Sequence, residues 1–313
     1  MGHELLELDN LAFTGTTPWH GLGTAMQSDD SIERWRAAAG LNWSILRKPV
    51  TFSPREELFV RVPDRQVFYR SDTNYALSIA SNRFVPVQPE QIVQFFKRIV
   101  ELHGFQLEVL GTLRNGVYIW GLARVGRMGL VTPVDPVRAY ILVCTICKPG
   151  FATTVRFTSV RVVCNNTLQI AFSRDRPIIS IPHIQQFDPE AVRVLLGLGV
   201  DSFGQFITDA RRLATTKILN EQALDYFYEV VGDPDLDIMD PEQPEALTAL
   251  QQEFVNSAGP STIWKALNIV TYHVDFQRPN RGVGGRLASA WFGSGAKTKE
   301  RALTNALKLA ATV

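Results

Sequence analysis

Residues 107–125 read LEVLGTLRNGVYIWGLARV, and this stretch decides the fold. Its two halves, residues 107–113 and 117–125, are rich in aliphatic and aromatic residues and flank Asn115-Gly116. Asparagine and glycine accept the positive φ that a tight hairpin turn requires. The stretch therefore predicts two antiparallel strands joined by a short turn.

Further regular elements are predicted on both sides of this hairpin. Downstream, residues 138–147 and 153–163 lie on either side of a Pro-Gly pair and predict a second hairpin. Upstream, Pro89 is followed by apolar residues at helical spacing until Gly104, which predicts an amphipathic helix. The middle of the chain is thus expected to consist of antiparallel β-hairpins with a packed helix.

The N-terminal part of the chain predicts one short helix and a small sheet. Asp30 and Glu33 have the spacing of a capping box, so a helix is expected from there to Gly40. The sheet is expected to contain three strands, at residues 43–52, 58–62 and 67–70. The last two are expected to be joined by a turn at Pro63-Asp64.

The C-terminal part is predicted to be mainly helical. Apolar periodicity predicts helices at residues 203–219, 221–231, 245–256, 262–276 and 297–311. An acidic, proline-interrupted connector at residues 233–245 is either a solvated linker or an electrostatic partner for basic residues. The expected fold class is α+β, with a β-rich core in residues 1–185 and a mainly helical half in residues 186–313.

Size and composition exclude several classes of protein. With 313 residues, 45% of them hydrophobic, and a net charge of +1, the chain is long enough to bury a sizeable core. No apolar run approaches the length that crosses a bilayer, and the first residues lack the positive charge and apolar core of a secretory signal. We therefore expect a cytoplasmic protein that makes no membrane contact.

The cysteine and histidine residues do not predict a specific chemistry. Three cysteines argue against a disulfide framework, and the Cys144-x-x-Cys147 pair fits either a zinc site or two buried thiols in a hairpin. None of the five histidines stands at a spacing that defines a catalytic class. The sequence thus predicts no catalytic residue, no metal and no cofactor.

Positive charge is concentrated near the C-terminus. From Ser261 onward there are eight Lys and Arg residues against two acids, in a glycine-rich stretch that contains Trp291 and Phe292. Cations neutralise phosphates and flat side chains stack on bases, so this basic segment, residues 278–301, predicts binding of single-stranded nucleic acid. The alternative is a solvated face paired with the acidic connector. The predicted phosphate contacts are Arg278, Arg281, Arg286, Lys297, Lys299 and Arg301.

A second group of hydrogen-bond donors belongs to the second hairpin. Such side chains hold phosphates, but an Asn-Asn-Thr sequence after a strand is equally typical of a turn or helix cap. The group consists of Lys148, Arg156, Arg161, Asn165 and Asn166.

Three separated stretches of the chain together resemble a known family. They are residues 18–23 (PWHGLG), 160–168 (VRVVCNNTL) and 263–275 (IWKALNIVTYHVD). The resemblance is to the phage- and plasmid-related proteins of domain of unknown function 932, and it extends over nearly the whole chain. Where family members often carry a Ser-His-Asp-Gly-like turn, residues 147–151 read CKPGF, so no role of that histidine is transferred.

This resemblance implies a role in replication, recombination or host takeover. Analogy with phage single-strand annealing proteins implies an α+β core that forms oligomers and holds DNA in a basic groove. The leading hypothesis is therefore a single-stranded DNA-binding and annealing protein that assembles into a homo-oligomeric ring or filament. Two alternatives are a nucleic-acid-processing enzyme that uses His20, His183 or His273, and a protein-binding host-takeover module that uses the acidic connector.

Overall fold

The structure, a computed structural model, describes residues 6–15, 23–161, 167–170, 179–184, 203–232, 243–278 and 285–313. The chain divides into two compact units. One comprises Met1–Gly126, Tyr140–Phe157 and Phe172–Gly199, and the other comprises Arg127–Ala139, Thr158–Ala171 and Val200–Val313. The boundary predicted between residues 185 and 186 lies outside the described residues, as does most of the predicted acidic connector at residues 233–245.

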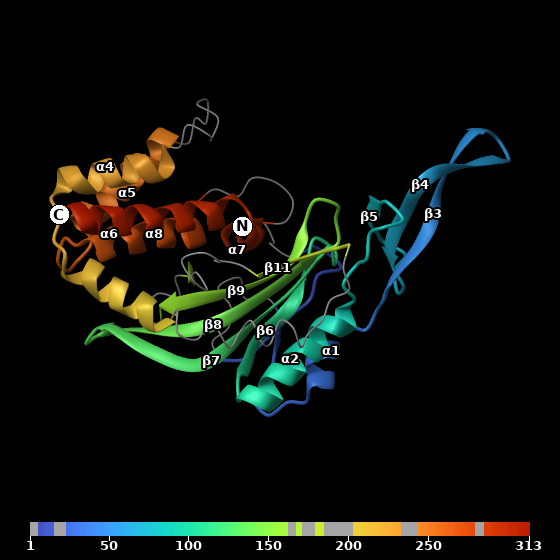
Figure 1. The fold of residues 1–313 in the computed structure, drawn as a ribbon, viewed down its shortest axis with the longest axis horizontal. Coiled ribbons are helices and arrows are strands. Elements are labelled where there is room, and N and C mark those ends of the chain that lie inside the picture. Colours follow the sequence, from blue (N-terminus) through green and yellow to red (C-terminus); the bar gives the residue numbers. More distant parts are fainter. Residues whose placement is uncertain are drawn as a thin grey trace. The chain divides into compact units, whose positions relative to one another are not determined.

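Most of the described strands belong to one large, mostly antiparallel sheet (Figure 1). Its order is β10-β9-β8-β7-β6-β1-β2, and β11 also pairs with β9. β1 and β2 pair in parallel, while β1 pairs antiparallel with β6. The strands are β1 (Leu11–Phe13), β2 (Thr24–Ala25), β6 (Gln106–Leu113), β7 (Tyr118–Thr132), β8 (Asp135–Ile146), β9 (Ala152–Arg161), β10 (Thr167–Ile170) and β11 (Ile179–Pro182).

The protein has a mixed α+β fold, but the predicted arrangement of hairpins in one half and helices in the other is wrong. The hairpins do not stand apart, because their strands join one sheet together with short strands from near the N-terminus and after residue 161. Backbone groups at the edge of a hairpin need hydrogen-bond partners, and neighbouring strands provide them. The helices are distributed along the chain, and two of them precede the hairpin that contains Asn115-Gly116.

The predicted hairpin around Asn115-Gly116 and the helix before it are confirmed. Arg114, Asn115 and Gly116 have φ values of 57°, 59° and 92° in the turn between β6 and β7. Helix α2 (Pro89–His103) ends at Gly104, which has a left-handed φ of 65°. A Cβ atom on Gly121 of β7 would lie 2.5 Å from a ring carbon of Phe96, so glycine lets the helix approach the sheet closely.

Helix α1 begins one residue later than the capping-box spacing predicts. It spans Ile32–Ala38, and its N-cap is Ser31, whose hydroxyl accepts a hydrogen bond from the backbone N–H of Arg34. Asp30 instead accepts a hydrogen bond from the backbone N–H of Gln27. The serine hydroxyl therefore takes the capping position that the aspartate was predicted to occupy.

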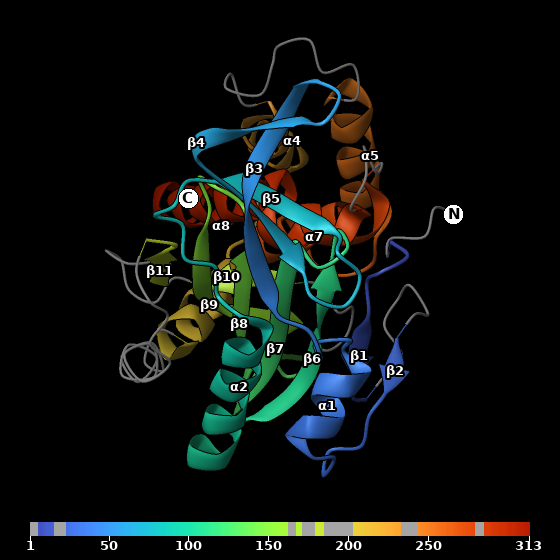
Figure 2. The ribbon, with the colours of Figure 1, turned by 90° about the vertical axis from the view of Figure 1, so that its right-hand side faces the viewer.

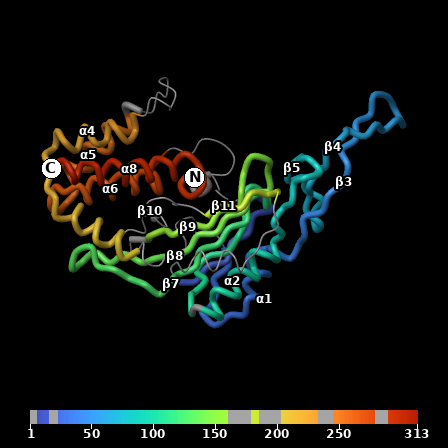
Figure 3. Tube along the Cα trace, viewed as in Figure 1, coloured from blue at the N-terminus to red at the C-terminus, as the bar shows by residue number. Residues whose placement is uncertain are grey.

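A separate three-stranded sheet has the order β3-β4-β5 (Figure 2). The strands are β3 (Ile45–Arg55), β4 (Leu58–Arg70) and β5 (Ala76–Ala80). The turn predicted at Pro63-Asp64 is wrong, because both residues lie inside β4, where the register with β3 shifts and Asp64 has a φ of 51°. β5 pairs only with residues 66–69, and beyond it β3 and β4 continue side by side to their turn (Figure 3). Residues 45–70 form this long hairpin, the arm.

The C-terminal residues are helical, as predicted, and pack around aromatic and aliphatic side chains such as Phe227, Phe254 and Leu267. The basic segment, however, is not one loop, because two helices occupy most of it. The elements are a helix at residues 203–215, α4 (Asn220–Val231), α5 (Gln243–Asn256), α6 (Ile263–Tyr272), the π-helix η1 (His273–Gln277), α7 (Gly285–Phe292) and α8 (Ser294–Thr312). In the described part of the chain, no helix has the length and apolarity needed to span a bilayer.

Candidate nucleic-acid interface

Lys299, one of the predicted phosphate contacts, lies in the interior. Its side chain is about 1% exposed, and its Nζ lies 2.7 Å from Oδ1 of the equally buried Asp275. The same ammonium group lies 5.8 Å from the centre of the Trp291 ring. Because its charge is used inside the protein, Lys299 does not contribute to a surface for phosphates.

The other predicted residues of the basic segment are only partly brought together. Lys297 is exposed at the start of α8, and Arg278, Trp291, Phe292 and Arg301 are half-buried. Burial also lowers the pKa of Arg301. Arg281 and the side chain of Arg286 lie outside the described residues. Lys297 and Arg301 are one turn apart on α8, so their side chains lie on neighbouring parts of the helix surface.

The donors predicted at the second hairpin do not form a described cluster. Lys148 and Arg156 are half-buried, whereas the side chain of Arg161 and both Asn165 and Asn166 lie outside the described residues. Cys144 and Cys147 are buried thiols, and burial raises the pKa of Cys147 to about 11. Among the described residues, no group of three or more histidine, cysteine or acidic side chains is placed to hold a metal ion.

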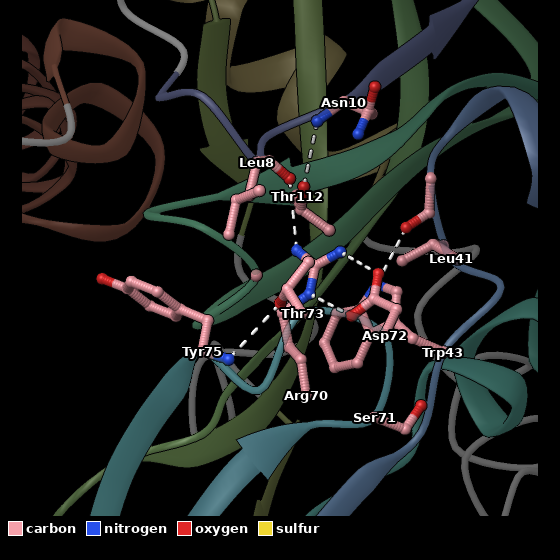
Figure 4. A network of polar contacts seen from close by, with 12 residues as sticks. Leu8, Asn10, Leu41, Trp43, Arg70, Ser71, Asp72, Thr73, Tyr75 and Thr112 are labelled. Carbon is pink, nitrogen blue, oxygen red and sulfur yellow. Dashed lines mark hydrogen bonds and ion pairs between the residues drawn. The ribbon is translucent and has the colours of Figure 1, made fainter.

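The arm is fixed at its base by a buried arginine (Figure 4). The Arg70 guanidinium donates to both carboxylate oxygens of Asp72, at 3.0 and 2.8 Å, and to the carbonyls of Leu8 and Asn115, each at 3.2 Å. It also stacks over the Trp43 ring at 4.4 Å. Leu8 precedes β1 and Asn115 lies in the β6–β7 turn, so one side chain fastens the arm to the large sheet.

The same contact requires a glycine in the β6–β7 turn. A Cβ atom on Gly116 would lie 2.9 Å from the Trp43 ring and 3.1 Å from a guanidinium nitrogen of Arg70. The Gly116 N–H donates to the Asp9 carboxylate at 3.3 Å. Burial raises the pKa of Asp9, against the opposing effect of its backbone hydrogen bonds. The arm is therefore mounted on a tightly packed base.

Strand alternation gives the arm two different faces. Near the base, Ile45 and Phe68 are buried on the face that packs against the rest of the unit, so Leu46 and its partner Tyr69 lie on the outer face. Further along, Phe52 pairs with Val60 on the outer face, and Thr51 pairs with Arg61 on the opposite face. The arm thus has an outer face and an inner face that differ in chemistry.

The inner face of the distal arm is polar and cationic. Phe59 is 73% exposed on this face, two residues before Arg61, which pairs with Thr51. Of the carboxylates in the arm, Glu56 and Glu57 lie in the turn, and Asp64 lies in β4 at the register shift, where it accepts a hydrogen bond from the backbone N–H of Asn82. The strand residues of this polar face are Arg47, Pro49, Thr51, Ser53, Phe59 and Arg61. Exposed cations beside an exposed aromatic ring are the combination that single-stranded nucleic acid requires.

The comparison with protein families matches residues 76–291 to the model described as "Domain of unknown function (DUF932)". The chain belongs to the DUF932 family. No curated protein and no solved structure matches it. Of the three stretches that carry the resemblance in the sequence, residues 160–168 and 263–275 fall within the match, and residues 18–23 precede it.

In this DUF932 protein, the arm precedes the matched residues and α8 follows them. Sequence reasoning predicted strands at the arm but assigned it no function. The signal was present: five cations and two phenylalanines lie between residues 47 and 65, in strands interrupted by Pro49 and Pro54. Whether these side chains are exposed depends on packing between residues far apart in the chain, and no local pattern in the sequence indicates it.

The histidines of the enzymatic alternative have few signs of catalytic use. His20 lies outside the described residues, and both His183 and His273 are buried. Nδ1 of His183 lies 3.2 Å from the Val85 carbonyl oxygen, and the Val85 N–H donates to the His183 carbonyl. These contacts tie the residue after β11 to the loop before α2, which is a structural role.

Acidification is expected to destabilise this DUF932 protein through His183. Burial lowers its pKa below the ordinary 6.5, although carbonyl contacts oppose the shift. The unfolded chain therefore binds the proton more readily, so stability is complete above pH 6.5 and decreases as pH falls toward the folded pKa. The slope is at most about 1.4 kcal/mol per pH unit for one histidine. Urea unfolding between pH 7.5 and 5.5 measures the free energy of unfolding as a function of pH. His183→Gln should make this free energy less dependent on pH. An equal slope in wild type and variant would contradict the role of His183.

Proposed function

We propose that this DUF932 protein binds single-stranded DNA and promotes the annealing of complementary strands. In this proposal the protein is of phage or plasmid origin and acts as an oligomer. The observation that carries the proposal is the polar face of the arm, where Phe59 is exposed beside Arg61. The basic segment was predicted to have this chemistry, and Lys297 and Arg301 of α8 are retained as further phosphate contacts.

The physical argument concerns both affinity and the choice of an unpaired strand. Guanidinium groups neutralise phosphates and release counterions, which gives affinity for any nucleic acid. An exposed phenylalanine ring adds about 1–3 kcal/mol for each base that stacks on it. In a duplex, bases already stack on one another, so the ring of Phe59 favours a single strand. A rigid mount at Arg70 keeps these groups in place before the strand arrives.

Binding to a labelled oligothymidine should weaken steeply with salt. Replacing two phosphate contacts, in Arg47→Ala/Arg61→Ala, should reduce the slope of log affinity against log salt by about 1.4, since each contact on a single strand contributes about 0.7. Phe59→Ser should reduce affinity by roughly fivefold to 150-fold at constant slope, because it removes stacking and no charge. Fluorescence anisotropy measures the salt slope of the wild type, the salt slope of the double variant and the affinity of Phe59→Ser.

Phe52→Ser is the matched control, because Phe52 is the same residue type on the outer face of the same arm. It should leave the affinity of an arm for the oligonucleotide unchanged. Salt-independent binding, or equal affinities for wild type and Arg47→Ala/Arg61→Ala, would reject the proposal. An annealing assay with complementary strands should recover both strands intact, whereas their cleavage would favour the enzymatic alternative.

A further inference from the structure

The outer face of the arm is apolar and has no described segment of the chain over it. Phe52 is 53% exposed and Ile79 of β5 is 56% exposed, and each pairs with a valine of β4, Val60 and Val67 respectively. Leu46 and Leu58 are also exposed large apolar side chains of this hairpin. Lys48 lies among these side chains on the same face. Exposed apolar side chains that gather on one face of a sheet are typical of a protein contact, and phosphate binding does not account for them.

The β3 edge of the arm is unsuited to adding a further strand. β3 is an edge strand of its sheet, and Pro49 and Pro54 remove two of its backbone donors. Extension of the sheet by another strand at this edge is therefore disfavoured. The apolar face remains, and it can be covered by the face of a second sheet, as in aligned sheet packing.

Opposite charges lie at the two ends of this face. Glu56 and Glu57 occupy the turn at the tip and outnumber the neighbouring Arg55, while Lys48 lies on the outer face toward the base. A two-fold axis across the middle of the arm places the tip of one copy over the base of the other. The acidic turn then meets Lys48 of the second copy at both ends, and the apolar side chains meet in the middle.

We propose that the outer face of the arm binds the same face of a second copy of this chain, in an antiparallel, two-fold arrangement. This inference rests on the proposed function to the extent that it names one contact of the proposed oligomer. A two-fold contact by itself gives a dimer, so the ring or filament expected from the sequence needs a further contact. Packing through the outer faces leaves the polar face of each arm exposed, so association and nucleic-acid binding use different residues.

Sedimentation equilibrium of the full chain without nucleic acid tests the contact. The wild type should associate reversibly, and Phe52→Ser should weaken the association by roughly tenfold or more. Phe59→Ser, the matched change on the polar face, should leave association unchanged. Both side chains are largely exposed, so neither variant removes a core contact. A wild type that stays monomeric up to its solubility limit, or equal effects of the two changes, overturns the proposal.

Charge reversal tests the antiparallel arrangement. Lys48→Glu alone, and Glu56→Lys/Glu57→Lys alone, should each weaken association, because like charges then meet at both ends. All three changes together should restore it. If the triple variant associates less than either parent, the antiparallel arrangement is overturned. If Phe52→Ser weakens oligonucleotide binding of an unassociated chain, the outer face binds nucleic acid and the inference fails while the proposed function stands.

Discussion

Lys299→Met is expected to lower the free energy of unfolding by about 3–5 kcal/mol, because it leaves the Asp275 carboxylate buried without its counter-charge. The Nζ–Oδ1 distance is 2.7 Å and both side chains are almost fully inaccessible to solvent. The substitution also removes the ammonium group near the Trp291 ring. Urea unfolding followed by circular dichroism measures the change. Lys297→Met is the matched control, because Lys297 is exposed two residues earlier on α8, and it should change stability by no more than about 0.5 kcal/mol.

A second variant separates the buried charge from the packing. Asp275→Leu/Lys299→Met replaces both ions with apolar side chains, so no uncompensated charge remains inside the protein. It should recover most of the stability that Lys299→Met loses, since exchanging a buried ion pair for apolar residues is often neutral or stabilising. If the double variant is less stable than Lys299→Met alone, the buried charge is not the cause of the loss.

Arg70→Met is expected to cost about 3–5 kcal/mol in the free energy of unfolding. It removes two hydrogen bonds to backbone carbonyls, the pair with Asp72 and the contact with Trp43, and it opens space in a buried site. Arg70→Lys should recover only part of the loss, because an ammonium group cannot bridge both carboxylate oxygens and both carbonyls. Equal stability of wild type and Arg70→Met would contradict this role.

The Arg70 prediction has a pH signature. The hydrogen bonds from Arg70 lower the pKa of Asp72 below its ordinary 3.8. The stability from this pair is present above that value and is lost as pH falls toward the folded pKa. The stability difference between wild type and Arg70→Met should therefore shrink in acid. Since Asp72 is partly exposed, the pH-dependent share is a minor part of the loss.

Local signals in the sequence predicted local elements well. The hairpin around Asn115-Gly116 and the helix from Pro89 to Gly104 follow from residues that permit or forbid particular backbone angles. Helix α8 follows equally from its apolar periodicity. In each of these elements, the deciding contacts are between residues close in sequence, and so a single sequence contains them.

Long-range placement was not predictable in the same way. The burial of Lys299 depends on Asp275, which lies on a different helical element, so charge counting assigned this lysine to the surface. The exposure of Phe59 depends on which segments of the chain pack over its face of the arm, and no described segment does. The chemistry predicted for the basic segment is found more completely on the arm, because aromatic side chains in strands with no cover remain accessible.

The division of the chain into interleaved units has a consequence for its synthesis. The N-terminal unit resumes after Tyr140 and again after Phe172, and the other unit needs residues 127–139 together with residues near the C-terminus. Neither unit can finish while translation is still in progress at the middle of the message. Strands that are translated early therefore precede their later partners, and no single cut of the gene separates the two units, because a fragment that contains all of one unit also contains segments of the other.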